Sequence, residues 1–261
     1  MSKPAPIGIL LSNLGTPDAP DSASLRRYLR EFLWDSRVVD LPRPLWWLIL
    51  NGVILNIRPP RSAALYRKVW TDEGSPLLAI TRRQQKKLQS HLEEQAPGGF
   101  RVELAMRYGK PSIAAGMQAL KDAGCARVLL LPLYPQYSSS TSASTFDAVA
   151  AFVRQGRDMP ELRMVRDYHD DPAYIAALAA SIEKDMQKNG RPDKLLLSFH
   201  GIPKRFHTTG DPYPDECRRT AELVAARLSL AADDWMLTFQ SRFGREEWMQ
   251  PYTDKTLEKL A

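Results

Sequence analysis

The sequence predicts an α/β protein of two similar halves, each a doubly wound parallel sheet, with an active-site cleft between the halves. Strand-like and helix-like segments alternate along the whole chain, and repeated βα units are typical of parallel sheets. The run at residues 127–133 is short and continuously apolar, as expected for a strand covered on both faces. With 261 residues, 44% of them hydrophobic and 25% charged, the chain can form one large domain or two packed ones.

The first half begins with an apolar strand at residues 7–14, followed by a helix that starts at Asp21 and ends near Trp34. A helix at 111–122 begins at a proline and is followed by Gly124, the usual order of start and stop signals. Further helices are predicted at 61–69, 77–95 and 144–154, and further strands at 101–107 and 127–133. These segments make an N-terminal lobe of residues 1–153.

The second half repeats this alternation in residues 154–261, the predicted C-terminal lobe. Strands are expected at 162–165, 194–199 and 235–240, and helices at 172–188, 215–228 and from Thr253 onward. The two halves are too dissimilar in sequence to indicate an internal repeat. No linker-like composition separates them, so we expect the lobes to pack closely.

Charge and cysteine content narrow the class of protein. The net charge of +6 comes from scattered basic pairs, which argues against nucleic-acid binding and fits an anionic small molecule or an acidic membrane surface. Cys125 and Cys217 lie outside any CxxC spacing, so they predict neither a disulfide framework nor a zinc site and indicate a reducing cytosol. The apolar N-terminal run lacks the length and cleavage site of an export signal.

One segment, residues 45–57 (LWWLILNGVILNI), is strongly apolar and has an arginine on each side. It is too short to cross a bilayer, which requires ~20 apolar residues. Tryptophan with flanking arginine is typical of an interfacial patch, in which Trp46 and Trp47 would contact a membrane surface. The alternative is a buried helix interrupted at the Asn-Gly pair within this segment.

His200 is the strongest candidate for a chemical role. It follows the strand at 194–199, and ligands of open α/β sheets bind beyond the carboxyl ends of the strands. The glycine, proline and aspartate residues of 201–212 predict an ordered, non-helical loop after it. An imidazole can move protons near neutral pH and bind metals. The alternative is that His200 merely caps the strand.

The other three histidines fit a chemical role less well. His169 lies in an aspartate-rich sequence that could bind a metal, but Asp-Asp-Pro before a helix is a capping signature, which we favour. His207 lies farther along the loop and is expected away from the reacting atoms. His91 is expected on a solvated helix face.

Five sequence blocks resemble the ferrochelatases, the enzymes that insert ferrous iron into a porphyrin. The sequence SFHGIPKRF…GDPYP, which contains His200, is similar to the histidine motif of that family. The other four blocks follow the family order: LSNLGTP (11–17), YRKVWTDEGSPL (66–77), LPLYPQYSSST (131–141) and FQSRFGREEWMQP (239–251). They span nearly the whole chain, and the histidine and PQYS blocks are specific to the family.

The resemblance implies a chelatase-like fold with Rossmann-like halves and an apolar lip at about residues 44–57. It implies that His200 is the catalytic proton acceptor and contacts the metal. The implied porphyrin contacts are Leu14, Arg67, Lys68, Ser75, Arg107, Tyr137, Ser138 and Trp248. Taken alone, each of these cations would be a surface charge and the serines an ordinary turn, whereas a large aromatic in a loop is expected to stack on something flat.

Ferrochelatases carry a further strand and a loop with a glutamate opposite the histidine, and nothing in this sequence matches them. The chain therefore resembles a ferrochelatase without its C-terminal part, for which we expect impaired or absent turnover even where porphyrin binds, and marginal solubility. Glu246, Glu247 and Glu258 are not assigned to the missing role.

The implied activity is insertion of Fe²⁺ into protoporphyrin IX, the last step of haem biosynthesis. Leu14 is apolar, as in protoporphyrin-using members, whereas coproporphyrin-using relatives tend to have a tyrosine there. Coproporphyrin as substrate, insertion of cobalt or nickel, and non-catalytic tetrapyrrole binding remain alternatives. Within this chain no cofactor is expected to be required, and Fe²⁺ is a substrate. The sequence does not indicate whether the protein carries an iron–sulfur cluster. The expected location is the cytoplasm, with peripheral contact at the inner face of the membrane.

Overall fold

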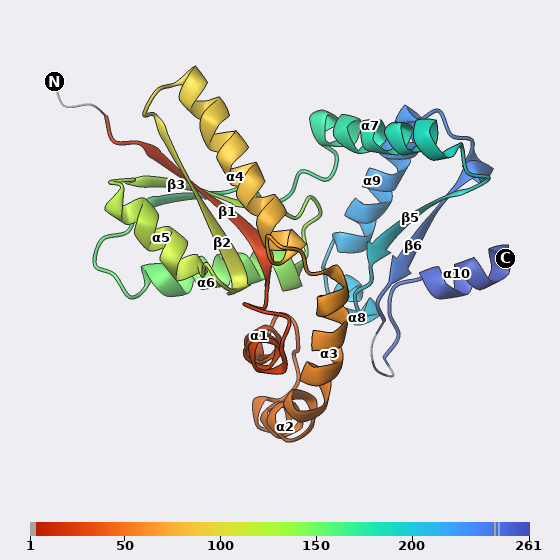
Figure 1. Cartoon of the computed structure of the whole chain (residues 1–261), viewed down its shortest axis with the longest axis horizontal. Helices are drawn as coiled ribbons and strands as arrows, with labels where there is room; N and C mark the ends of the chain where they lie inside the picture. Colours follow the sequence, from red (N-terminus) through yellow and green to blue (C-terminus); the bar gives the residue numbers. More distant parts are fainter. Residues whose placement is uncertain (1–3, 243, 245) are drawn as a thin grey trace. The chain divides into compact units, whose positions relative to one another are not determined.

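The computed structural model describes residues 4–242, 244 and 246–261. They form two compact units, the first made of residues up to 134 together with 139–166, and the second of residues 135–138 together with 167–261. Each unit combines helices with parallel strands, which confirms the predicted α/β class (Figure 1). The face-to-face arrangement of two halves remains a prediction.

The first unit contains a parallel sheet with the strand order β2-β1-β3-β4. Its strands are β1 (Ile7–Thr16), β2 (Phe100–Gly109), β3 (Arg127–Pro132) and β4 (Glu161–Met164). Because β1 pairs with β2 on one side and with β3 on the other, the winding direction reverses next to β1. In open α/β sheets, ligands bind beyond the carboxyl ends of the strands at such a reversal.

The sequence predicts β4 at residues 162–165 and places it in the second half. The structure pairs it with β3, where Leu130 lies opposite Met164, so β4 is the edge strand of the first sheet. A four-residue strand carries too little pattern to reveal its partner, which only the pairing itself decides. The limits of the two lobes, 1–153 and 154–261, remain a prediction.

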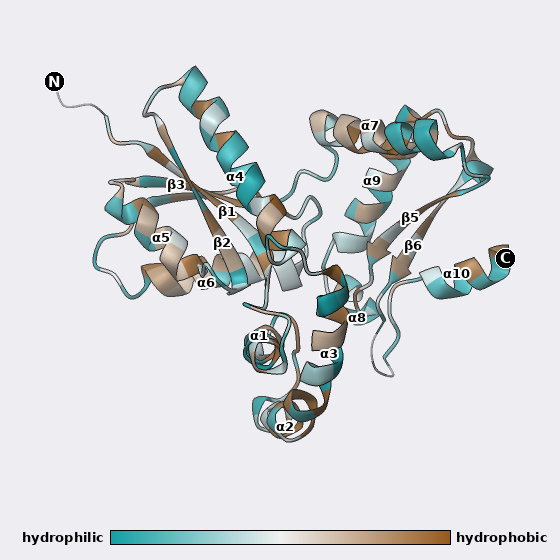
Figure 2. Ribbon diagram, viewed as in Figure 1, coloured by the Kyte–Doolittle hydropathy of each residue, from teal (hydrophilic) through white to brown (hydrophobic). Residues whose placement is uncertain are grey.

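Helices cover both faces of the first sheet, as a doubly wound fold requires. α4 (Pro76–Gln95) lies on one face, and α5 (Ile113–Asp122) and α6 (Ser144–Val153) lie on the other (Figure 1). Leu10 of β1 is buried on the α5–α6 face, whereas Ile9 is buried on the α4 face. Successive strand residues point to opposite faces, so an apolar run such as β1 serves two cores at once, and Figure 2 shows hydrophobic residues along these strands.

The helix ends in this unit follow the sequence signals. Asp21 caps α1 (Ser22–Trp34), accepting a hydrogen bond from the Ser24 main-chain N–H at 2.8 Å. Ser112 caps α5 in the same way, and α5 begins at Ile113, two residues after the start that the sequence predicts at Pro111. A π-helical turn, η2 (Ser139–Ala143), precedes α6.

The apolar segment forms a helical stretch of α2 (Arg43–Ile49), the π-helical turn η1 (Leu50–Ile54) and α3 (Leu55–Val69). The interruption expected at the Asn-Gly pair is this π-helical turn. It accommodates one extra residue per turn with i→i+5 hydrogen bonds, so the chain stays helical. No helix among residues 4–242, 244 and 246–261 is both long and apolar enough to span a bilayer.

The two tryptophans of this segment have different environments. Trp46 is 5% exposed, and its indole Nε1–H donates to the Leu33 carbonyl oxygen at 2.7 Å. Trp47 is 54% exposed and lies near Leu48, which is also exposed. Of the two tryptophans predicted at a membrane surface, Trp46 is therefore buried in the protein instead, because its N–H finds a buried acceptor.

The second unit is built on a two-stranded parallel sheet of β5 (Leu195–His200) and β6 (Trp235–Gln240). Its remaining elements are α7 (Pro172–Asn189), α8 (Lys204–Thr208), α9 (Tyr213–Arg227), the 3₁₀ turn η3 (Ala232–Asp234) and α10 (Thr253–Leu260). α9 packs on the face that carries Phe199 and Phe239. On the other face, the Thr253 hydroxyl of α10 hydrogen-bonds with the Ser198 and Thr238 hydroxyls, each at 2.9 Å.

The sequence predicts a non-helical loop after His200. This prediction is wrong in part, because the loop contains the short helix α8. Pro203 stands at the N-cap of α8 with φ −55°, and the Thr209 N–H donates to the Arg205 carbonyl oxygen. Proline suits a helix start, since it lacks only a donor that the first turn would leave unpaired.

Candidate active site

His200 is the last residue of β5 and pairs with Gln240 of β6. Strand alternation places its side chain on the face that carries Ser198, opposite the α9 core. The side chain is exposed, and no hydrogen bond or ion pair to another described residue holds its ring. Although the side chain is exposed, neighbouring atoms partly desolvate the ring and lower the pKa of His200 below the ordinary value of 6.5, which favours the neutral imidazole at pH 7.

Trp248, the predicted stacking residue, lies beside the histidine loop. It forms an isolated β-bridge with Pro203, and a Cβ added at Gly201 would lie 3.4 Å from the Trp248 ring. The same Cβ would come 3.0 Å from the Gln240 carbonyl oxygen, so the residue after His200 is tightly confined by backbone and indole. The structure thus brings His200 and Trp248 together within one unit.

The two glutamates before Trp248 are engaged by cations of α8. Lys204 Nζ lies 3.0 Å from a carboxylate oxygen of Glu247, and Arg205 pairs with Glu246. These ion pairs join the loop before Trp248 to the loop after His200.

Three consecutive residues of the PQYS motif hydrogen-bond to the segment that runs from the GDPYP motif into α9. Gln136 Nε2 donates to the Thr220 hydroxyl at 2.9 Å, the Tyr137 main-chain N–H donates to Glu216 at 2.6 Å, and the Ser138 hydroxyl donates to Asp211 at 3.0 Å. The acceptors lie just before α9 and on its first turns. Segment 135–138 therefore lies along the start of α9.

These contacts qualify the predicted roles of Tyr137 and Ser138. Ser138 is buried and its hydroxyl is already bound to Asp211, so the structure gives it a clear role in holding the loop. The Tyr137 side chain is half-buried, and its backbone is fixed by Glu216. Contact of either residue with a ligand remains a prediction.

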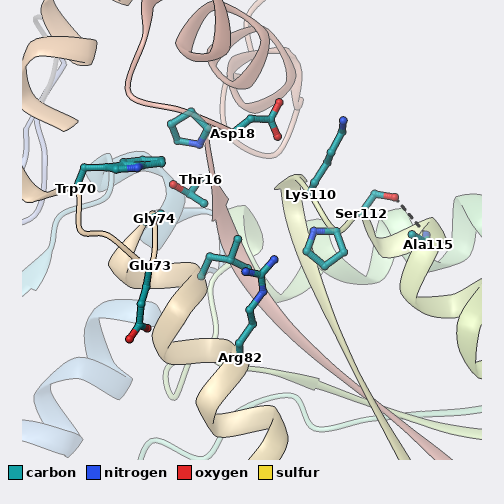
Figure 3. A pocket seen from close by; sticks show the side chains of 13 residues that line it. Thr16, Asp18, Trp70, Glu73, Gly74, Arg82, Lys110, Ser112 and Ala115 are labelled. Carbon is teal, nitrogen blue, oxygen red and sulfur yellow. Dashed lines mark hydrogen bonds between the residues drawn. The ribbon is translucent and has the colours of Figure 1, made fainter. Parts of the chain in front are cut away.

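In the first unit, Ser75 lines a cavity of about 710 Å³ at the carboxyl ends of β1 and β2. Figure 3 shows Thr16 and Trp70 on one side of this pocket, and Lys110, Ser112 and Ala115 on the other, with Arg82 between them. Ser75 is the N-cap of α4. The free N–H groups at the start of that 20-residue helix favour a negatively charged ligand.

Charges around this cavity add to the same preference. Asp18 and Glu73 are paired with Arg27 and Arg83, respectively, which offsets their negative charge. Arg82 and Lys110 have no ion-pair partner among the described residues. The pocket is therefore suited to an anionic group such as a carboxylate.

One polar atom of the cavity wall lacks a partner. Thr16 is only 3% exposed, and its side-chain Oγ1 makes no hydrogen bond within the described structure. An unpaired buried hydroxyl costs about 1–3 kcal/mol. A ligand oxygen in the pocket would remove that cost. The sequence indicates no role for Arg82 and Lys110, which lie outside the motifs, and none for Thr16 within the LSNLGTP block.

Arg107, at the end of β2, is held within the first unit rather than projecting freely from it. Its Nη2 lies 2.6 Å from Asp35, and its Nε donates to the Ser144 hydroxyl at 2.6 Å. The Tyr108 hydroxyl donates to the same Asp35 oxygen at 2.8 Å. Burial alone would raise the pKa of Asp35, but hydrogen bonds from Ser144, the Arg37 N–H and Tyr108, with the Arg107 charge, hold it below its usual value.

The remaining predicted contacts also lie in the first unit. Leu14 is half-buried and packs beside Tyr28 and Tyr108 at the end of β1. Arg67 and Lys68 are exposed in the last turn of α3, and Arg67 Nη1 donates to the Pro20 carbonyl oxygen at 3.3 Å.

The remaining histidines and the cysteines have defined environments. Asp171 caps α7 by accepting from the Ala173 and Tyr174 N–H groups, which confirms the capping interpretation of the Asp-Asp-Pro sequence. His169, however, also hydrogen-bonds through Nδ1 with Asp167 at 2.9 Å. Cys125 and Cys217 are buried, and burial raises the pKa of the Cys217 thiol to about 12.

His207 and His91 lie away from these groups. His207 lies in α8, and its Nδ1 is 3.1 Å from the Asp211 carbonyl oxygen. His91 is exposed on α4, where its Nε2 lies 3.0 Å from the Gln95 amide nitrogen. Neither environment indicates a chemical role, in agreement with the sequence analysis.

Comparison with known proteins connects these features. The family model described as Ferrochelatase matches residues 6–261. The chain is 56% identical over 257 residues to a ferrochelatase of Thioalkalivibrio sulfidiphilus, covering 98% of this chain and 70% of the relative. It is 51% identical over 259 residues to a ferrochelatase of Marinobacter nauticus (99% and 70%), and 53% identical over 257 residues to one of Alcanivorax borkumensis (98% and 75%).

Proposed function

The chain belongs to the ferrochelatase family, and from this premise we propose that it inserts ferrous iron into protoporphyrin IX to form haem, as a lyase of haem biosynthesis. The observation that carries the proposal is the exposed imidazole of His200 at the carboxyl end of β5, with the Trp248 indole beside the next residue. Iron is a substrate in this reaction.

Insertion of a metal into a porphyrin requires a base, because two pyrrole protons must leave as the metal enters. His200 accepts a proton when it is neutral, and its lowered pKa keeps it neutral near pH 7. The same ring nitrogen can contact the incoming metal ion. We therefore assign both the proton-accepting and the metal-contacting role to His200.

The macrocycle must also be held flat and oriented. Trp248 offers an aromatic face for stacking, and Leu14 offers an apolar contact near the carboxyl end of β1. Tyr137 and Ser138 are proposed as further contacts, with Ser138 acting mainly through the position of its loop.

Anionic propionate groups require cations or N–H donors. We propose that they bind in the cavity at Ser75, where the start of α4, Thr16 and the two unpaired cations Arg82 and Lys110 favour a carboxylate. Arg67 and Lys68 supply exposed positive charge in the last turn of α3. Arg107 acts through Asp35 and Ser144, which support this end of the sheet.

The proposal is tested by following porphyrin absorbance first without metal and then with Fe²⁺ under anaerobic conditions. We expect a metalloporphyrin spectrum, and a fall of at least ~10²-fold in insertion rate for His200→Ala, with porphyrin binding retained, because general-base catalysis contributes about this much. His207→Ala is the matched control, since that ring lies in α8 and contacts the Asp211 carbonyl. An unchanged rate in His200→Ala would refute the assigned base.

We further propose a cytoplasmic location with peripheral contact at a membrane surface. The exposed apolar residues of the α2–α3 segment support it: Leu45, Trp47, Leu48, Val53 and Ile57. Co-sedimentation with anionic liposomes tests it. We expect Trp47→Ser to pellet less than wild type, and equal pelleting would remove the idea. Trp46 is left intact because it is buried.

A further inference from the structure

A group of potential metal ligands lies in the second unit, on elements other than the β5–α8 loop that carries His200. Asp167 and His169 come from the loop before α7, and Glu216 comes from the first turn of α9. One ligand atom from each lies within 4.8 Å of the other two. His169 Nδ1 is 2.9 Å from Asp167 Oδ1 and 3.6 Å from Glu216 Oε2.

We propose that Asp167, His169 and Glu216 bind a divalent transition-metal ion at a site separate from His200. Metal bonds of about 2.0–2.2 Å to nitrogen and oxygen place neighbouring ligand atoms roughly 3–3.5 Å apart in tetrahedral or octahedral geometry. The two distances measured from Nδ1 lie close to that range, so a metal can replace the shared proton with small side-chain movements.

The ligand types select a class of metal. One imidazole nitrogen with two carboxylate oxygens suits Zn²⁺, Fe²⁺, Co²⁺ or Mn²⁺, whereas Ca²⁺ and Mg²⁺ prefer oxygen ligands alone.

A surrounding hydrogen-bond network holds the ligands in place. The Tyr137 main-chain N–H donates to Glu216 Oε2 at 2.6 Å. The Thr220 hydroxyl donates to the His169 carbonyl oxygen at 2.7 Å and accepts from Gln136 Nε2 at 2.9 Å. Such support around the ligands is a common feature of metal sites and raises their affinity. The PQYS motif therefore helps to orient this site.

The test uses the full chain with His200→Ala, so that the catalytic imidazole does not contribute. Zn²⁺ is titrated by isothermal calorimetry, and Co²⁺ by its visible absorption. We expect one equivalent to bind with saturation. Adding His169→Ala should weaken binding at least ~10-fold, since a three-ligand site then loses its nitrogen. Adding His91→Ala, which removes an exposed histidine from α4, should leave binding unchanged.

A second variant guards against simple misfolding. Glu216→Gln keeps an oxygen that can accept the Tyr137 N–H while removing the charge, and we expect it to weaken Zn²⁺ binding at least ~10-fold with unchanged circular dichroism. No saturable binding in His200→Ala, or equal binding after His169→Ala or Glu216→Gln, would overturn the proposal. Because His200 is absent throughout, the result is independent of the proposed insertion activity.

Discussion

The two sheets of this protein differ in how fully their strands are buried. In β1 the residues from Gly8 to Ser12 are all buried, with helices on both faces. In β5 no residue is buried, and the face opposite α9 carries a hydroxyl contact between Ser198 and Thr253 instead of an apolar core.

The same difference separates two predicted site residues at strand ends. Arg107, at the end of the well-covered β2, is bound by Asp35 and Ser144, and its side chain is 17% exposed. His200, at the end of β5, is exposed and has no ring partner among the described residues. A strand-end polar group thus becomes part of the scaffold where the sheet is covered, and stays available for chemistry where the sheet is open.

The largest expected effect compares the two cores directly. Leu10→Ala removes a fully buried side chain between two layers and should lower the free energy of unfolding by about 3–4 kcal/mol. Leu197→Ala in the half-buried β5 should cost about 1–2 kcal/mol, because less apolar area is lost and the site is partly open to water. Urea denaturation measures both, and equal costs would contradict the comparison.

The second effect concerns the hydrogen bonds of the Thr220 hydroxyl in the second unit. Thr220→Val removes the hydroxyl that joins Gln136 to the His169 carbonyl, and should cost about 1–3 kcal/mol because both groups lose a buried partner. Thr220→Ser keeps the hydroxyl and is the matched control. If the valine and serine variants unfold at the same urea concentration, these hydrogen bonds do not contribute to the free energy of unfolding.

The third effect is a pH dependence that belongs to the first unit. The pKa of Asp35 is lower in the folded state than its usual 3.8, so the ionised carboxylate stabilises the fold above that value. This contribution is lost as the pH falls through the folded-state pKa. The stability difference between wild type and Asp35→Asn should therefore shrink from pH 7 to pH 3, and a constant difference would contradict it.

The smallest effect is the titration of His200 itself. Burial lowers its pKa below 6.5, so the midpoint of its imidazole signals in NMR should lie below that of an unperturbed histidine. The neutral form then persists to more acidic pH, which favours a base. A midpoint at or above 6.5 would show that β5 does not desolvate its last residue.

Much of this fold could be predicted from local sequence patterns. The strands at 7–14, 101–107 and 235–240 and the helices at 77–95 and 172–188 are confirmed to within one or two residues at most ends. Apolar runs and capping residues act within a few positions of the chain, so their consequences are readable there. The sequence predictions of α8 and of the partner of β4 are wrong, because a single helical turn and a four-residue strand carry weak patterns.

The site was predicted less completely than the fold. Motifs indicate His200 and Trp248, which the structure places at the end of β5 and on a neighbouring loop. Nothing local marked Glu216 as a neighbour of His169, which lies 47 positions away in the chain. Burial also separated Trp46 from Trp47, since adjacent helix residues face in different directions.

The sequence by itself determined the alternation of strands and helices, the family to which the chain belongs, and the position of His200 after a strand. These depend on residue order over short distances, where periodicity and motif chemistry operate. The tertiary structure alone decided which charges are neutralised, as with Arg107, and which ligand atoms meet, as with Asp167, His169 and Glu216. The reason is physical: burial, pairing and pKa depend on neighbours in space, which chain order does not specify.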